Sequence, residues 1–261
     1  MSATTRMHRI LFFTVVPILW VLIGVVMPCH ADLMLRVDNL DTPEVDVFVV
    51  DQVFNLGGLS MYSGASPNNN TPSVADQYIQ EGAVGFTGGV GSFSMSVTVG
   101  LSGPLLGEEA RMDLFNVTLS GGSGTLVVEL WDTDFHSNVV AGGQTTFQTL
   151  VGGTTDGLFE IGTYADDSAA AFGTQYLLGG GTFDGLADSD GLAFAGETVT
   201  ALSSASLSGN YALGIRASIT HTGLEVTSFD VDLRQVPEPA AGLLALIVLL
   251  VLGSSRPRRR S

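Results

Sequence analysis

The feature that most constrains this chain is a two-residue alternation of apolar and polar side chains. In the stretch Ser92–Val99, Phe93, Met95 and Val97 alternate with serine and threonine. A period of two places successive side chains on opposite faces of an extended strand, so one face is apolar and the other polar. Such strands form antiparallel sheets with one buried face.

The alternation recurs in four further stretches: Val45–Val49, Thr125–Trp131, Tyr211–Ile219 and Thr227–Leu233. Between them lie glycine-rich breaks that we interpret as turns and loops: 57–58, 88–89, 121–124, 142–143, 152–153 and 179–181. Residues 163–178 fit a short helix and a loop equally well. We therefore predict an all-β fold, a jelly-roll-like antiparallel β-sandwich of two packed sheets.

The first 31 residues have the form of a secretory signal peptide. Two arginines precede an apolar run that ends at Met27, and small residues follow it. This predicts an N-terminal signal helix that is removed by cleavage between Ala31 and Asp32. A retained membrane helix is the alternative, because the apolar run is long enough to span a bilayer.

The last 26 residues have three chemically distinct parts. The first is a proline-bracketed acid, in the order Val236, Pro237, Glu238, Pro239 and Ala240. Its prolines exclude a helix and favour an extended, accessible segment. Residues 240–255 carry no charge and predict a transmembrane helix roughly 24 Å long, somewhat shorter than a hydrocarbon core of ~30 Å.

The final six residues, 256–261, carry a cluster of four arginines: Arg256, Arg258, Arg259 and Arg260. By the positive-inside rule these arginines remain in the cytoplasm, with the body of the protein outside. On physical grounds alone, the three parts fit an ordinary C-terminal anchor and a sorting signal equally well.

In order, spacing and position, the three parts resemble the PEP-CTERM sorting signal of exopolysaccharide-producing Gram-negative bacteria. The resemblance implies processing at or near residues 237–239 by an exosortase, a membrane-embedded cysteine transpeptidase. It also implies that the arginines are a retention signal. The protein would lie transiently in the inner membrane with its body on the periplasmic side, and then at the cell surface or in the extracellular matrix. Signal peptidase and the secretion machinery would be its other partners.

Residues 82–233 also resemble a recurrent β-rich ectodomain of PEP-CTERM proteins. The similarity lies in strand and turn segments: Val90–Gly100, Met112–Leu119, Leu130–Phe135, Ile219–Gly223 and Ser228–Asp230. No catalytic role comes with this resemblance.

The body, residues 32–235, is strongly acidic. Four arginines, no lysine and 25 acids give it a formal charge of −21. Nucleic acid is excluded as a partner, because phosphate binding requires the opposite charge. The single cysteine, Cys29, is lost with the signal, so the mature protein has no disulfide. The 204 residues of the body suffice for one all-β domain between the signal (1–31) and the tail (236–261).

Two groups of acids could bind calcium. Asp132 and Asp134 are two residues apart in a strand, so their side chains point to the same side. The second group matches the third, fifth and twelfth positions of an EF-hand loop: Asp188, Asp190 and Glu197. Its first position is Leu186, where the loop requires aspartate. We expect a solvated turn at the first group and an acidic surface loop at the second, and therefore assign no cofactor.

No pattern in the chain indicates catalysis. His136 and His221 lack the spacing of a zinc site, and no serine stands in a G-x-S-x-G turn. We therefore expect a non-catalytic surface or exopolysaccharide-matrix protein and not an enzyme. The alternative is a secreted carbohydrate-binding or carbohydrate-active protein on a β-sandwich scaffold, with Trp131 and the tyrosines as candidate sugar-stacking residues.

Overall fold

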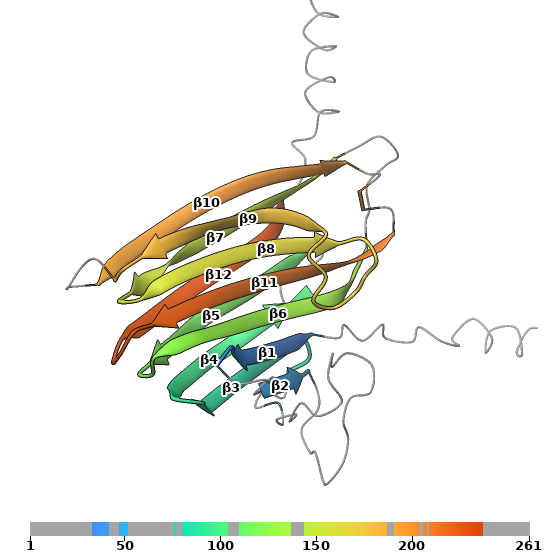
Figure 1. The fold of residues 1–261 in the computed structure, drawn as a ribbon. Coiled ribbons are helices and arrows are strands. Elements are labelled where there is room, and N and C mark those ends of the chain that lie inside the picture. The colour runs from blue at the N-terminus through green and yellow to red at the C-terminus, as the bar shows by residue number, and fades with distance from the viewer. Residues whose placement is uncertain are drawn as a thin grey trace, which may run out of the picture. The chain divides into compact units, whose positions relative to one another are not determined.

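A computed structural model describes residues 33–41, 47–51, 76, 80–103, 110–136, 144–186, 191–203, 206–207 and 209–236. These residues contain twelve strands in two six-stranded antiparallel sheets, packed face to face (Figure 1). The prediction of an all-β antiparallel sandwich is confirmed. Within the described ranges no helix has the length and apolar character needed to cross a membrane. The predicted signal helix and transmembrane helix lie outside those ranges.

The two sheets differ in strand order. Sheet A has the order β2-β1-β6-β11-β8-β9, made of β1 (Met34–Asn39), β2 (Val47–Val50), β6 (Gly124–His136), β8 (Leu158–Asp166), β9 (Tyr176–Asp184) and β11 (Asn210–His221). Sheet B has the order β10-β7-β12-β5-β4-β3, made of β3 (Ala83–Val90), β4 (Phe93–Ser102), β5 (Arg111–Ser120), β7 (Gln144–Thr155), β10 (Leu192–Ser203) and β12 (Val226–Val236).

The last eight strands form one long antiparallel ribbon. In this ribbon β5 pairs with β12, β6 with β11, β7 with β10 and β8 with β9, so its tip is the β8–β9 connection. The ribbon is wound so that β7 also pairs with β12 and β8 with β11. This winding gives the strand order of a jelly roll. The strands β1 and β2 extend sheet A, and β3 and β4 extend sheet B.

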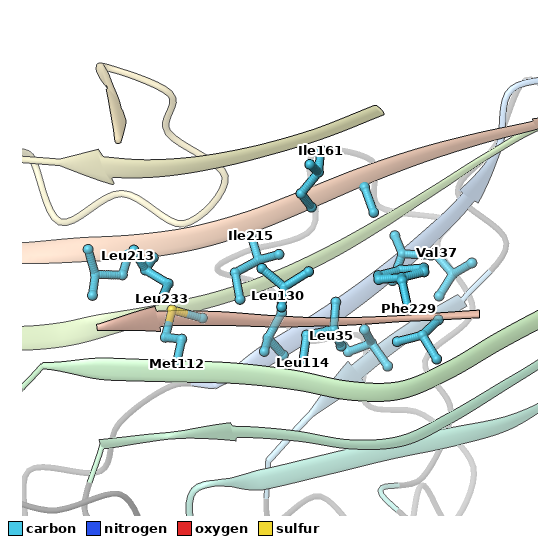
Figure 2. Packing of buried hydrophobic residues seen from close by; sticks show 14 of the residues in the cluster. Leu35, Val37, Met112, Leu114, Leu130, Ile161, Leu213, Ile215, Phe229 and Leu233 are labelled. Carbon is cyan, nitrogen blue, oxygen red and sulfur yellow. The ribbon is translucent and has the colours of Figure 1, made fainter. Parts of the chain in front are cut away.

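The main core lies between the two sheets. Figure 2 shows members of this core, including Leu130 and Ile215 of sheet A and Leu114 and Leu233 of sheet B. All four side chains are fully buried. Each stands at an apolar position of a strand, so the two-residue alternation accounts for which side chains face inward.

Several glycine-rich breaks are not turns. The pairs at 88–89 and 152–153 and the triplet at 179–181 lie inside β3, β7 and β9, so their interpretation as loops is wrong. At most of these positions neighbouring atoms fill the space that a Cβ would need, although Gly89 and Gly152 have no neighbour closer than 3.8 Å. A Cβ on Gly153 would collide with the carbonyl oxygen of Ser228, and one on Gly179 would lie 2.7 Å from Thr149 Oγ1. The break at 121–124 does contain the turn between β5 and β6.

Candidate functional site

The connection between β8 and β9, residues 167–175, folds back over the outer face of sheet A, and we name it the strap (Figure 1). Asp166 organises its start, because Asp166 Oδ1 accepts a hydrogen bond of 2.9 Å from the Ser168 amide. Gln175 Oε1 accepts a bond of 3.1 Å from the Asp167 amide and so joins the two ends of the strap. The sequence fitted a short helix and a loop equally well at residues 163–178, and between β8 and β9 the structure has a loop.

Phe172 fixes the strap to the sheet. Its φ of 63° lies in the left-handed region, which costs an aromatic residue about 1–3 kcal/mol. The ring compensates through contacts, with its centroid 6.2 Å from that of Phe48 and 6.0 Å from that of Trp131. Phe48, Met34 and Val50 form a second apolar cluster outside the main core, and Phe172 packs against it. We infer that this packing holds the strained backbone in place.

Trp131 lies beneath the strap and is 0% exposed. Its indole lies flat over Gly214, where a Cβ would collide with the ring. Tyr164 stacks beside it, with ring centroids 6.3 Å apart and planes inclined by 18°. The hypothesis that Trp131 is an accessible sugar-stacking residue is therefore wrong. Alternation alone could place Trp131 on the outer face, but not show that a loop covers that face.

A buried ion-pair network adjoins these rings. Arg36, Glu129 and Arg216 stand opposite one another on β1, β6 and β11, because the strand register aligns them. Glu129, with 3% of its side chain exposed, contacts Arg36 Nη2 and lies 3.6 Å from Arg216 Nε. The Arg36 guanidinium also sits 4.3 Å from the centre of the Phe172 ring. The network therefore connects the sheet to the strap.

The other two arginines of the body lie on sheet B. Arg111 Nε donates to Asp232 Oδ1 at 2.9 Å, and Arg111 Nη2 donates to Asp113 Oδ2 at 3.3 Å. Burial and the neighbouring Asp232 raise the pKa of Asp113, and Arg111 offsets only part of this effect. Arg234 Nε donates to Gln148 Oε1 at 2.7 Å. Each arginine of the body thus has a structural partner.

An open groove runs along the edge of the sandwich, where β9 of sheet A meets β10 of sheet B. Its volume is about 470 Å³, and we name it the edge groove. Gly162 of β8 pairs with Gly180 of β9 in its floor, where the Tyr164 ring lies over Gly162. The larger residues around the floor are Glu160, Tyr164, Leu177, Thr182, Thr198 and Thr200. The sequence pattern indicated only the glycines and did not predict the groove, because the groove forms only when β8 pairs with β9.

The first predicted calcium group is only partly described. Asp132 lies inside β6, is 1% exposed, and accepts a hydrogen bond at Oδ2 from Ser102 Oγ of β4, on the other sheet. The expectation of a solvated turn is therefore wrong for Asp132. The Asp134 side chain is outside the described part of the structure.

Of the second group of candidate calcium ligands, only one residue is described. Asp188 and Asp190 lie outside the described ranges, whereas Glu197 is exposed on β10 and accepts a bond of 2.5 Å from Gln148 Nε2. Among the described residues, no three His, Cys, Asp or Glu side chains are grouped so that they could hold a metal ion. Calcium binding by Asp134, Asp188 and Asp190 stays the untested alternative to solvated acids.

The two histidines of the body have different surroundings. His136 is exposed at the end of β6. His221 is buried, with Nδ1 3.0 Å from the Gly121 carbonyl oxygen and Nε2 2.9 Å from Thr227 Oγ1. Because a carbonyl only accepts, Nδ1 donates to Gly121, and Nε2 shares a hydrogen bond with the Thr227 hydroxyl. His221 therefore connects β11 to β12 and to the β5–β6 turn.

The predicted processing sites flank the described body. The first described residue, Leu33, is fully buried, and its carbonyl oxygen accepts a 2.9 Å bond from the Asp51 amide. Ala31 and Asp32 lie just outside the described ranges. At the other end, Val236 is the last residue of β12 and pairs with Thr146 of β7. The rest of the sorting motif and the arginine cluster fall in residues 237–261, which the structure does not describe.

No protein-family model matches the chain, and no curated protein matches it. The enzymatically active domain of tailspike protein 4 from bacteriophage CBA120 is similar at 11% identity and a TM-score of 0.28, over 59% of this chain and 19% of that one. The isomalto-dextranase of Arthrobacter globiformis T6, complexed with panose, is similar at 13% identity and a TM-score of 0.23, over 56% of this chain and 24% of that one. The VP2 subviral particle of infectious bursal disease virus is similar at 11% identity and a TM-score of 0.15, over 87% of this chain and 70% of that one. The chain thus spans 19% and 24% of the first two proteins, and these similarities carry no argument about function.

Proposed function

We propose that the protein is a non-catalytic surface or exopolysaccharide-matrix protein that is exported through its N-terminal signal and processed by an exosortase at its C-terminal signal. The observation that carries this proposal is the order of the tail: Pro-Glu-Pro, an uncharged apolar run, and an arginine cluster. The end of β12 at Val236 supports it, because the motif then follows directly on the folded body. Pro237 cannot donate a further ladder hydrogen bond, so the strand has a physical reason to end there.

The start of the body also supports the proposal. Cleavage between Ala31 and Asp32 would leave β1 intact, since this strand begins at Met34. The surface chemistry of the body agrees as well. Its arginines are engaged in structural contacts, and its formal charge of −21 favours solubility outside the cell.

The test is to express the full chain in a host with an exosortase and in the same host without it. Intact-mass spectrometry then identifies the C-terminus. We expect the arginine cluster to be lost only where the exosortase is present. The double variant Pro237→Ala/Glu238→Ala should retain the cluster, whereas Glu225→Ala, an acid of the β11–β12 turn, should be processed normally. Retention of Arg258–Arg260 in the exosortase host would make the tail a plain anchor.

Carbohydrate binding on the same scaffold is a second candidate function. The edge groove favours it, because an aromatic ring, an exposed leucine and a carboxylate line one open surface there. Binding without cleavage is compatible with a role in a polysaccharide matrix.

A further inference from the structure

The edge groove has the size of a ligand site. Its volume of about 470 Å³ lies within the ~300–1,000 Å³ typical of small-molecule sites. It lies on the outer face of β8 and β9 and reaches the threonines of β10 on the other sheet. Gly162 and Gly180 pair in the floor, and the absence of a side chain on Gly162 leaves room for the Tyr164 ring to lie over it.

One wall of the groove is a positioned aromatic ring. Tyr164 lies across Gly162, so a Cβ there would come 2.5 Å from Tyr164 Oη. On its other side the ring stacks beside the buried Trp131. Its orientation is therefore set before any ligand arrives. Leu177, opposite Tyr164 in the strand pairing, is 61% exposed and extends this apolar surface.

The opposite wall is polar. Glu160 and Thr182 form an outward-facing pair on β8 and β9, separated from the Tyr164–Leu177 pair by the Gly162–Gly180 pair. Both are exposed. They offer a carboxylate acceptor and a hydroxyl that both donates and accepts. Among the described residues that line the groove, Glu160 is the one charged residue and none is cationic. A polyanion would meet like charge here, so an uncharged polysaccharide fits the groove better than an anionic one.

The backbone of β8 in the floor of the groove is paired with a neighbouring strand on both sides. Gly162 pairs with Arg216 of β11 on one side and with Gly180 of β9 on the other. An extended peptide could therefore not add a strand next to β8. Because β9 is the edge strand of sheet A, strand addition along its outer edge is the alternative that peptide competition tests. A pyranose needs no free backbone, because its C–H face packs on an aromatic ring and its hydroxyls bond to side chains.

We propose that the edge groove binds a segment of a neutral polysaccharide, with a sugar ring against Tyr164 and Leu177 and its hydroxyls toward Glu160 and Thr182. The proposal rests on the proposed function in one respect, the expectation that the protein meets polysaccharide outside the cell. Its physical basis is the groove itself.

The test is affinity electrophoresis and calorimetry of the full-length protein in mild detergent. The probes are soluble neutral glucan, galactan and mannan, with polygalacturonate as the anionic comparison. We expect saturable binding to at least one neutral polymer and none to polygalacturonate. Tyr164→Ala should weaken binding more than tenfold and Leu177→Ala about fivefold, by loss of apolar contact. Leu224→Ala, a leucine that is 96% exposed in the β11–β12 turn, is the matched control and should bind normally.

Tyr164→Ala also removes the ring beside Trp131, so this variant could lose stability. Leu177→Ala and Glu160→Gln change only exposed side chains. These two variants decide the test if Tyr164→Ala is unstable. The proposal is overturned if no neutral polymer binds, if polygalacturonate binds equally well, or if Leu177→Ala and Glu160→Gln leave binding unchanged. Competition by an extended peptide at the same site would also overturn it. C-terminal processing is measured separately by mass spectrometry, so a failure of the groove and a failure of the sorting proposal are distinguishable.

Discussion

Substitution of Glu129 tests the ion-pair network that connects sheet A to the strap. Glu129→Gln keeps the shape of the side chain and removes the charge that neutralises Arg36 and Arg216. Breaking a buried ion pair typically costs 3–5 kcal/mol, because the remaining charge is buried without a partner. The exposed fractions of the side chains are 17% for Arg36 and 44% for Arg216, so both can partly reach water. We therefore expect the lower end of this range, about 3 kcal/mol.

The loss is large enough to measure by unfolding. For a domain of this size each kcal/mol lowers Tm by about 2–4 °C, so Glu129→Gln should lower it by roughly 6–12 °C. Thermal and urea unfolding, followed by circular dichroism, measure the change. Fluorescence gives a local readout, because Trp131 is the one tryptophan of the body. The matched control is Glu160→Gln on β8, which is exposed and should change stability by less than about 0.5 kcal/mol.

A double-mutant cycle then isolates the interaction. Arg36→Gln alone leaves the Glu129 carboxylate buried without this partner, and combining it with Glu129→Gln should cost less than the sum of the two single changes. A cost below about 1 kcal/mol for Glu129→Gln, with unchanged Trp131 emission, would refute the argument that this network stabilises the outer face.

Three further predictions concern single side chains. Phe172→Ala should cost about 2 kcal/mol and shift the emission of Trp131 to longer wavelength, because the ring that covers the indole is lost; unchanged emission would mean that the strap does not cover it. Burial raises the pKa of Tyr211, and no described residue bonds its buried hydroxyl, so Tyr211→Phe should stabilise the protein by about 1 kcal/mol in urea unfolding; a loss would reveal a bonding partner. The folded-state pKa of Asp113 is raised above its reference of 3.8, so stability falls as pH rises between the two values, and the charge is a net cost at neutral pH. Asp113→Asn should therefore raise Tm at pH 7 and lose this advantage below about pH 4, and an equal effect at both pH values would contradict the assignment.

The strands that the sequence predicted are those with a clear alternation. Residues 92–99, 125–131, 211–219 and 227–233 fall in β4, β6, β11 and β12. The alternation did not predict β7, β9 and β10, because glycines, which are depleted in strands, interrupt them and their threonines leave no clear apolar period. Their conformation depends on crowding by distant neighbours, as at Gly153 against Ser228. Such crowding cannot be read from a local pattern.

The candidate site illustrates the same limit. Trp131 and Tyr164 both stand on the outer face of sheet A, yet one is fully buried and the other lines the groove. The difference comes from the strap, which carries Phe172 over the indole. Nothing in the two strands distinguishes the rings, because the covering loop enters from the tip of the ribbon.

The residue pattern was enough to predict the all-β class and antiparallel strands, because side-chain periodicity is a local property of a strand. It also determined the acidity of the body and supplied the two terminal signals on which the export proposal depends. Only the tertiary structure decided the jelly-roll order, in which β5 pairs with β12 across more than a hundred residues of chain. It alone also decided which aromatic ring is covered and where the groove opens. These features arise from contacts between segments far apart in the sequence, and local periodicity carries no information about such contacts.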